Sequence, residues 1–228
     1  MMFPLDELIA RHRMKVEGIV HCGAHLGQEA ESYEACGVER VLWIEAIPEL
    51  MERLNERVYP LGHTTVCACL GSRDGVEVSF HYADSPDRAN LGQSSSVLPL
   101  GTHRQLYPDI GYIGAVTMRT QTLASLVDSN WPWDVPPNFL NMDLQGYELE
   151  CLKGAEPILG WFDWIYTEFF EDPLYEGSAL MPELGAWLQA RGFRLAEKKM
   201  FGAQTREATN EKWYGWGDAL FARERPAR

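Results

Sequence analysis

The chain has 228 residues, of which 46% are hydrophobic, and its 20 basic and 33 acidic residues give a net charge of −13. This length suits one α/β domain with a sizeable core, so we expect a single domain over residues 1–228 with an inserted loop region at 84–114. The negative charge disfavours a nucleic-acid partner, because duplex binding depends on Lys and Arg side chains that neutralise phosphates.

Residues 1–15 are amphipathic and carry charges, unlike a signal peptide. No segment has the roughly 20 apolar residues needed to cross a bilayer. We therefore expect a cytoplasmic protein with no membrane partner. Five cysteines form no C-x-x-C pair, and an odd number fits a disulfide framework poorly, so we interpret them as reduced, mostly buried thiols.

Apolar runs of strand length alternate along the chain with helix-like segments. The expected strands lie at 18–22, 40–46, 63–70, 138–144, 162–170, near 193–199 and at 218–223. The expected helices lie at 28–36, 48–58, 149–159 and 181–191. This alternation predicts a mostly parallel sheet covered on both faces, a doubly wound α/β fold. Residues 76–125 interrupt it with two extra strands around a polar, Gly/Pro/Ser-rich insert.

The first expected strand ends in a glycine loop with the sequence VHCGAHLGQEA. In open α/β sheets ligands bind at the carboxyl ends of the strands, where a glycine lets the backbone approach closely. The spacing G-x-x-x-G lacks the third glycine of a dinucleotide loop and the Lys of a phosphate loop, so a pyrophosphate ligand is disfavoured. A plain turn from strand to helix remains an equal alternative. A zinc site at His21 and His25 is rejected, because these side chains need not converge.

Glu45 ends the second expected strand, in WIEAIPEL. Rossmann-like folds place a carboxylate there to accept both ribose hydroxyls of an adenosine. The alternative is a solvated glutamate at the end of a strand.

Six segments together resemble the FkbM family of S-adenosylmethionine (SAM)-dependent methyltransferases. They are VHCGAHLGQEA, WIEAIPEL, SSSVLPL, TQTLASL, MDLQGYELECLKGAE and EFFEDPLYEG. The resemblance runs from about residue 17 to 223. It implies a Rossmann-like class I methyltransferase fold, with seven strands and an antiparallel last strand. It also implies methyl transfer, most often to a hydroxyl of a sugar or natural product.

The resemblance also implies the residues that hold SAM or its product S-adenosylhomocysteine (SAH). Glu45 would hold the ribose. The methionine end would be lined by Gly23, Ala24, His25 and Gly27. The adenine would be flanked by Ala46, Ile47, Cys69 and Leu70.

Three positions depart from the family pattern. His21 and Ala124 stand where an aspartate is usual, and Gln145 stands where a glutamate is usual. A protonated His21 would repel the ammonium and sulfonium groups of the donor. We therefore expect a neutral imidazole at the donor site that acts through hydrogen bonds.

Methyl transfer to an alcohol needs alignment and a proton acceptor. Asp143 is the first candidate for base, donor contact or acceptor anchor, and Glu168 is the second. Asp143 has an equal alternative, a carboxylate that binds the backbone of residues 145 and 146. Together, Asp143 and Glu168 are a less favoured site for Mg²⁺, because a third oxygen ligand is lacking.

Candidate acceptor-binding residues lie in the least patterned parts of the chain. They are Ser95, Ser96, His103, Tyr175 and Trp213, the last two as part of an aromatic wall. Solvated loop positions and core packing are the alternatives. Two other functions stay open, a nicotinamide dehydrogenase, which would need a third glycine, and a catalytically degenerate domain that binds the donor as a structural or regulatory ligand. The acceptor and the oligomeric state are not readable from the sequence.

Overall fold

The computed structural model describes residues 4–86, 91–201 and 215–224. These residues group into two compact units. The first unit comprises Met1–Val76, Arg119–Asp143 and Glu150–Tyr166, and the second comprises Glu77–Met118, Leu144–Leu149 and Thr167–Arg228. The single domain over 1–228 stays a prediction, and each unit is described by itself below.

A seven-stranded sheet runs in the order β3-β2-β1-β7-β8-β10-β9. Its strands are β1 Ile19–Cys22, β2 Val41–Glu45, β3 Thr64–Cys67, β7 Phe139–Met142, β8 Trp164–Phe170, β9 Phe193–Met200 and β10 Trp216–Arg223. β1 pairs in parallel with β2 and β7, β2 pairs in parallel with β3, and β10 is antiparallel to β9. This order and the antiparallel pair confirm the predicted fold class.

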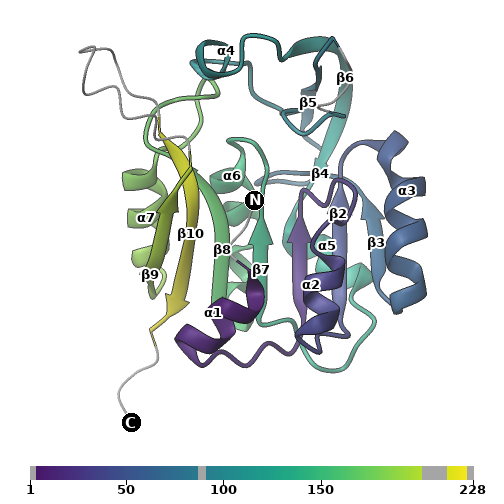
Figure 1. Ribbon diagram of the computed structural model, residues 1–228, viewed down its shortest axis with the longest axis vertical. Coiled ribbons are helices and arrows are strands. Elements are labelled where there is room, and N and C mark those ends of the chain that lie inside the picture. Colours follow the sequence, from purple (N-terminus) through teal and green to yellow (C-terminus); the bar gives the residue numbers. More distant parts are fainter. Residues whose placement is uncertain (1–3, 87–90, 202–214, 225–228) are drawn as a thin grey trace. The chain divides into compact units, whose positions relative to one another are not determined.

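The central strands are apolar because both of their faces are covered. Every residue of β1, β2 and β7 is buried, as expected for parallel strands between layers of helices. Helices α1 Leu5–His12, α2 Ala30–Ala35, α3 Pro48–Val58 and α5 Leu123–Asn130 belong to the first unit. In α3, Pro48 starts the helix and Leu50, Leu54 and Val58 form its buried face. Figure 1 shows α3 beside β3.

The strand expected over 63–70 is wrong as one element. It breaks at Ala68 into β3 and β4 Cys69–Leu70. β4 belongs to a second, three-stranded sheet of order β4-β6-β5, formed with β5 Glu77–Asp84 and β6 Gly111–Gln121. The backbone N–H of Ala68 makes the last bond of the β3 ladder, to Glu45 O at 2.9 Å, and the next two residues, Cys69 and Leu70, pair with β6 instead. Both extra strands of the insert are confirmed.

The helix expected over 149–159 is also two elements, α6 Glu148–Gly154 and the 3₁₀ helix η2 Glu156–Trp161. A Cβ on Gly154 would lie 2.2 Å from Gly71 O. The backbones of Gly154 and Gly71 therefore pack directly against each other. Pro157, in the first turn of η2, cannot continue the hydrogen bonds of α6. The pattern of apolar residues continues through both elements and hid the break.

Smaller elements complete the chain. The 3₁₀ helix η1 Tyr59–Leu61 follows α3, the short α4 His103–Leu106 lies in the insert, and α7 Met181–Gln189 precedes β9. Within the described ranges no helix has the length and apolarity needed to span a membrane. All five cysteines are free thiols, and Cys22, Cys69 and Cys151 are buried.

Candidate functional site

The glycine loop between β1 and α2 is a tight turn built by backbone hydrogen bonds. The N–H groups of Gly23 and Ala24 both donate to Ile44 O, at 2.9 and 3.0 Å, and Gly27 N donates to Ala24 O at 2.8 Å. Three residues of the turn have positive φ: Gly23 at 80°, His25 at 46° and Gly27 at 65°. Glycine adopts this conformation at little cost. The loop is therefore fixed against the end of β2.

Gly27 needs to be a glycine for a reason that the sequence did not show. A Cβ at this position would lie 2.9 Å from Leu54 Cδ1 and 3.1 Å from Val58 Cγ1, both on α3. The missing side chain makes room for a helix. A role of Gly27 in donor binding stays a prediction, and it would act through the backbone.

Glu45 is a buried carboxylate held by two backbone amides. His25 N donates to its Oε2 at 2.7 Å and Ile47 N to its Oε1 at 2.8 Å. Burial raises the pKa of the Glu45 carboxyl above its usual value, and these amide bonds act in the opposite direction. A carboxylate has about four lone-pair sites, so these bonds leave the carboxylate able to accept further donors. This arrangement fits the predicted pair of ribose hydroxyls.

His21 lies in a buried polar cluster of the first unit. Its Nδ1 lies 3.1 Å from Tyr33 Oη and 3.2 Å from Asn141 Nδ2, and its ring stacks on Trp43 with 4.7 Å between centroids. Burial lowers the pKa of His21 to about 3. The ring is therefore neutral near pH 7, as the hypothesis requires, and its hydrogen bonds join β1, α2 and β7.

The predicted adenine-flanking residues lie at the ends of β2 and β4. Ile47 is buried at the start of α3 and Ala46 is half-buried. Cys69 and Leu70 are buried on β4, and burial raises the pKa of the Cys69 thiol to about 11. Cys67, the last residue of β3, is exposed, and its Sγ donates to Ala46 O at 3.9 Å. These positions adjoin Glu45 through the Ala68 backbone bond.

Asp143 follows β7 directly and is exposed. Its backbone N–H donates to Cys22 O at 3.0 Å, which places it beside the end of β1. Burial raises the pKa of the Glu29 carboxyl, and the charge of Asp143 adds to this rise. The first unit thus carries two acidic side chains near its glycine loop.

Glu148 was not singled out from the sequence. Its Oε1 accepts from Leu144 N at 2.8 Å and from Gly146 N at 3.2 Å, so it holds the loop that follows β7. It is only 4% exposed. Its position as the first residue of α6, just after a glycine turn, is the sequence signal that was available, since acidic residues favour the first turn of a helix.

In the second unit a chain of hydrogen bonds leads to Glu168. Tyr175 Oη donates to Gln145 Oε1 at 2.5 Å, and Gln145 Nε2 donates to Glu168 Oε2 at 3.1 Å. Ser96 Oγ donates to the backbone oxygen of Gln145 at 2.8 Å. The structure therefore brings together three predicted site residues, Ser96, Glu168 and Tyr175. All three contact Gln145, which the sequence analysis noted only as a departure from the family pattern.

The two other candidate residues of the insert, Ser95 and His103, make hydrogen bonds to neighbouring residues of the second unit. Ser95 Oγ accepts from Ala83 N at 2.9 Å, and His103 Nε2 lies 3.3 Å from Ser94 Oγ. His103 Nδ1 is buried without a partner among the described residues. Burial lowers the pKa of His103 to about 4. Acceptor binding by Ser95, Ser96 and His103 stays a prediction.

Tyr175 belongs to a buried cluster and not to an open aromatic wall. It is fully buried with Phe170 and Leu100, and Trp216 packs against this cluster. Trp213 lies outside the described residues. The aromatic character of EDPLYEG therefore reflects packing around the Tyr175 hydroxyl bond.

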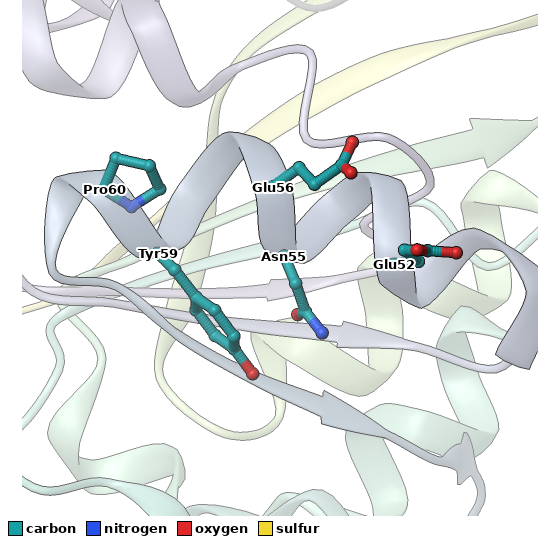
Figure 2. A pocket seen from close by; sticks show the side chains of 5 residues that line it. All are labelled: Glu52, Asn55, Glu56, Tyr59 and Pro60. Carbon is teal, nitrogen blue, oxygen red and sulfur yellow. The ribbon is translucent and has the colours of Figure 1, made fainter.

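A surface hollow of about 790 Å³ lies on the outer side of α3 and η1. Figure 2 shows the side chains that line it: Glu52, Asn55, Glu56, Tyr59 and Pro60. None of the predicted site residues lines this hollow. In the described part of the chain no group of three or more His, Cys, Asp and Glu side chains is placed to hold a metal ion. Mg²⁺ at Asp143 and Glu168 stays a prediction.

Sequence comparison identifies the family. A profile described as "Methyltransferase FkbM domain" matches residues 21–195, more than half of the chain. This chain belongs to the methyltransferase FkbM domain family. The predicted resemblance is confirmed, and the FkbM domain match includes the glycine loop, Glu45, Gln145 and Glu168. Comparison with curated protein sequences gives no match.

Solved structures with a similar fold are distant in sequence from this FkbM domain. A proposed RNA methyltransferase from Pyrococcus horikoshii has a TM-score of 0.51 and 9% identity, over 97% of this chain and 82% of that one. Magnesium protoporphyrin IX methyltransferase from Synechocystis, with bound SAM, has a TM-score of 0.50 and 10% identity, over 96% and 76%. TrmK from M. capricolum, with SAH, has a TM-score of 0.51 and 6% identity, over 99% and 70%. These similarities support the fold.

Proposed function

We propose that this FkbM domain binds SAM and catalyses transfer of its methyl group to a hydroxyl of a small molecule, such as a sugar or another natural product. The observation that carries the proposal is Glu45, a buried carboxylate fixed at the end of β2 by amides of the glycine loop and of α3. Its remaining lone pairs suit the two ribose hydroxyls of an adenosine. Two fold relatives carry SAM or SAH, which supports this donor.

The residues of the first unit would hold the donor. Glu45 accepts from the ribose, Ala46 and Ile47 flank the adenine, and the backbone of the glycine loop lies at the methionine end. When bound, SAM supplies a methyl group on a positively charged sulfur. The acidic side chains Glu29 and Asp143 add negative charge beside this loop, which favours a cationic ligand.

Of the two predicted bases, Asp143 and Glu168, we propose Glu168, because the bond from Gln145 Nε2 fixes its carboxylate. Asp143, the first candidate from the sequence, is the alternative. Transfer forms an oxygen–methyl bond, breaks the sulfur–methyl bond and releases the proton of the acceptor hydroxyl, which Glu168 would take. A small acceptor is favoured over RNA, although one fold relative is a proposed RNA methyltransferase. The net charge of −13 would repel a polyanion.

Thermal shift with SAH, with NAD and without ligand tests the donor. Stabilisation by SAH alone supports the proposal, whereas stabilisation by NAD alone would favour a dehydrogenase. Mass spectrometry of the purified chain for bound SAH is a second readout. Labelled methyl transfer to panels of sugars and hydroxylated natural products then separates an enzyme from a domain that binds SAM without turnover, the alternative raised by His21 and Gln145.

A further inference from the structure

Gln145 has an unusual backbone conformation for its residue type. Its φ is 52°, in the left-handed region, and the next residue, Gly146, has a φ of 97°. A residue other than glycine holds this conformation at a cost of about 1 kcal/mol or more, so surrounding bonds must maintain it. Glu148 Oε1 binds the N–H groups on both sides of Gln145, and Ser96 Oγ donates to its carbonyl. The side chain is therefore held in a fixed direction.

When Glu168 is ionised, the side-chain bonds of Gln145 have one consistent direction. An ionised carboxylate accepts hydrogen bonds and cannot donate them, so the NH₂ group of Gln145 must face Glu168. The amide oxygen then faces Tyr175, whose hydroxyl donates to it. Rotating the amide by 180° would put its oxygen against the Glu168 carboxylate and its NH₂ against the tyrosine donor. The Tyr175 hydroxyl also lies 3.4 Å from Ser94 O, a second acceptor for its proton. The ionised Glu168 carboxylate therefore sets the orientation of the amide, and the shorter bond from Tyr175 supports it.

Burial of Glu168 makes the hydrogen bond from Gln145 important for the charge of its carboxylate. Glu168 is 7% exposed and Tyr175 is 0% exposed. A buried carboxylate stays ionised only when hydrogen-bond donors or positive charges compensate for lost water. The amide of Gln145 supplies a donor without adding charge. A glutamate at the same place would put a second carboxylate about 3 Å from the first, and in such pairs repulsion raises the pKa of one of the two carboxyls.

We propose that Gln145 is a positioning residue, supported by Tyr175, that keeps Glu168 ionised and aimed as the proton acceptor for methyl transfer. The inference rests on the proposed function, because it assigns Glu168 the role of base. This chain has one carboxylate where a glutamate at 145 would give a coupled pair.

The second unit holds other buried titratable groups. They are Glu148, Tyr175, His103 and Asp218 of β10, the strand next to β8. His103, whose pKa is about 4, is neutral at higher pH. Asp143 directly precedes the loop in the chain. A test must therefore follow Glu168 itself and not the summed titration of the protein.

The test is a ¹³C NMR titration of the Glu168 side-chain carboxyl in the full chain labelled at glutamate, assigned by the signal lost in Glu168→Gln. In Gln145→Glu we expect the titration midpoint of Glu168 to rise by about one pH unit or more, since two carboxylates then repel. Gln145→Leu, which loses the donor without adding charge, should raise the midpoint by a smaller amount. Thermal unfolding checks that each variant is folded.

Tyrosine variants give the matched comparison. Tyr175→Phe should raise the Glu168 midpoint by a few tenths of a pH unit, because the amide loses a partner that supports its orientation. Tyr112→Phe removes another hydroxyl of the second unit, one that donates to Leu98 O at 2.5 Å, and should leave the midpoint unchanged. If the Tyr175 hydroxyl had only a structural role, Tyr175→Phe would lower the melting temperature without moving the midpoint.

The inference is overturned if the midpoint in folded Gln145→Glu or Gln145→Leu stays at the wild-type value. SAH binding by calorimetry, measured in parallel, separates this outcome from failure of the proposed function. A wild-type chain that does not bind SAH refutes the donor assignment, whereas the titration still decides whether Gln145 controls Glu168.

Discussion

Glu45 and Glu148 are two buried glutamates, one in each compact unit, and each binds two backbone amides. Both oxygens of Glu45 accept a hydrogen bond. One donor is the N–H of His25 in the glycine loop, and the other is the N–H of Ile47 at the start of α3. Glu148 uses one oxygen, Oε1, for two amides of its own loop, Leu144 and Gly146. Glu45 therefore joins two separate elements of the first unit, whereas Glu148 closes a single loop of the second unit.

This difference indicates which glutamate serves a ligand. A carboxylate that joins the ends of β1 and β2 lies where parallel strands present their carboxyl ends, the usual ligand position in such sheets. A carboxylate that closes its own loop contributes local rigidity. We therefore expect Glu45, and not Glu148, to bind the donor, whereas Glu148 supports its own loop.

Glu45→Gln is expected to have the largest effect. It should weaken SAH binding about 100-fold, equivalent to about 2.7 kcal/mol, because a charged acceptor of buried hydrogen bonds is lost. Calorimetry with SAH measures this. Glu49→Gln, an exposed change four residues away, is the control. Equal affinities of the two variants would remove Glu45 from the donor site.

Gly27→Ala should destabilise the first unit by about 2.5 kcal/mol. The new Cβ adds strain at a φ of 65° and contacts Leu54 and Val58 too closely. Gly37→Ala, at a φ of 73° with no atom within 4 Å of the added Cβ, isolates the strain alone and should cost about 1 kcal/mol. Urea unfolding of both variants measures the difference, and identical losses would contradict the packing role of Gly27.

His21 predicts a dependence of stability on pH. Its folded pKa of about 3 lies below the value of about 6.5 in the unfolded chain, so the unfolded state binds more protons between these values. Its contribution is complete above pH 6.5 and is lost as the pH falls, by about 2 kcal/mol at pH 5. His21→Asn should reduce the slope of unfolding free energy between pH 7 and 5, to which His63 and His103 also contribute.

The same pKa has a consequence for the donor. Because the His21 ring stays neutral between pH 5.5 and 8, we expect it to cause no change in SAH affinity over this range. A slope that disappears in His21→Asn would show that the ring titrates when the donor binds.

Glu148→Gln should have the smallest effect, a loss of about 1 to 2 kcal/mol in unfolding free energy, because the two amides keep a neutral acceptor. SAH affinity should change less than twofold. A large loss of SAH binding would contradict the division of roles between the two glutamates.

The sequence predicted the first unit better than the second, and for a physical reason. Parallel strands bring their carboxyl ends to one edge, so Gly23 and Glu45 were identified from position alone. The break at Ala68 was missed because residues 64–70 contain only strand-forming or small side chains, and periodicity cannot show a change of sheet. The break after Gly154 was missed because the close approach to Gly71 is a tertiary contact.

The second unit could not be predicted in this way. The bonds from Tyr175 to Gln145 and on to Glu168 join residues 30 and 23 positions apart in the chain. Neither spacing follows the period of a helix or a strand, so no sequence pattern predicts these two hydrogen bonds. Glu168 was found because it lies near the end of β8, and Gln145 was noted only as a departure from a family pattern.

The exposed thiol of Cys67 offers a chemical reporter for the predicted donor site. Cys22, Cys69 and Cys151 are buried, so a maleimide should modify Cys67 well before those three. Burial and the nearby Glu45 and Glu49 raise the pKa of this thiol. Because the thiolate is the reactive form, the raised pKa slows alkylation. A nucleoside seated against Ala46 would shield the sulfur, and the alkylation rate would then measure occupancy before any methyl acceptor is known.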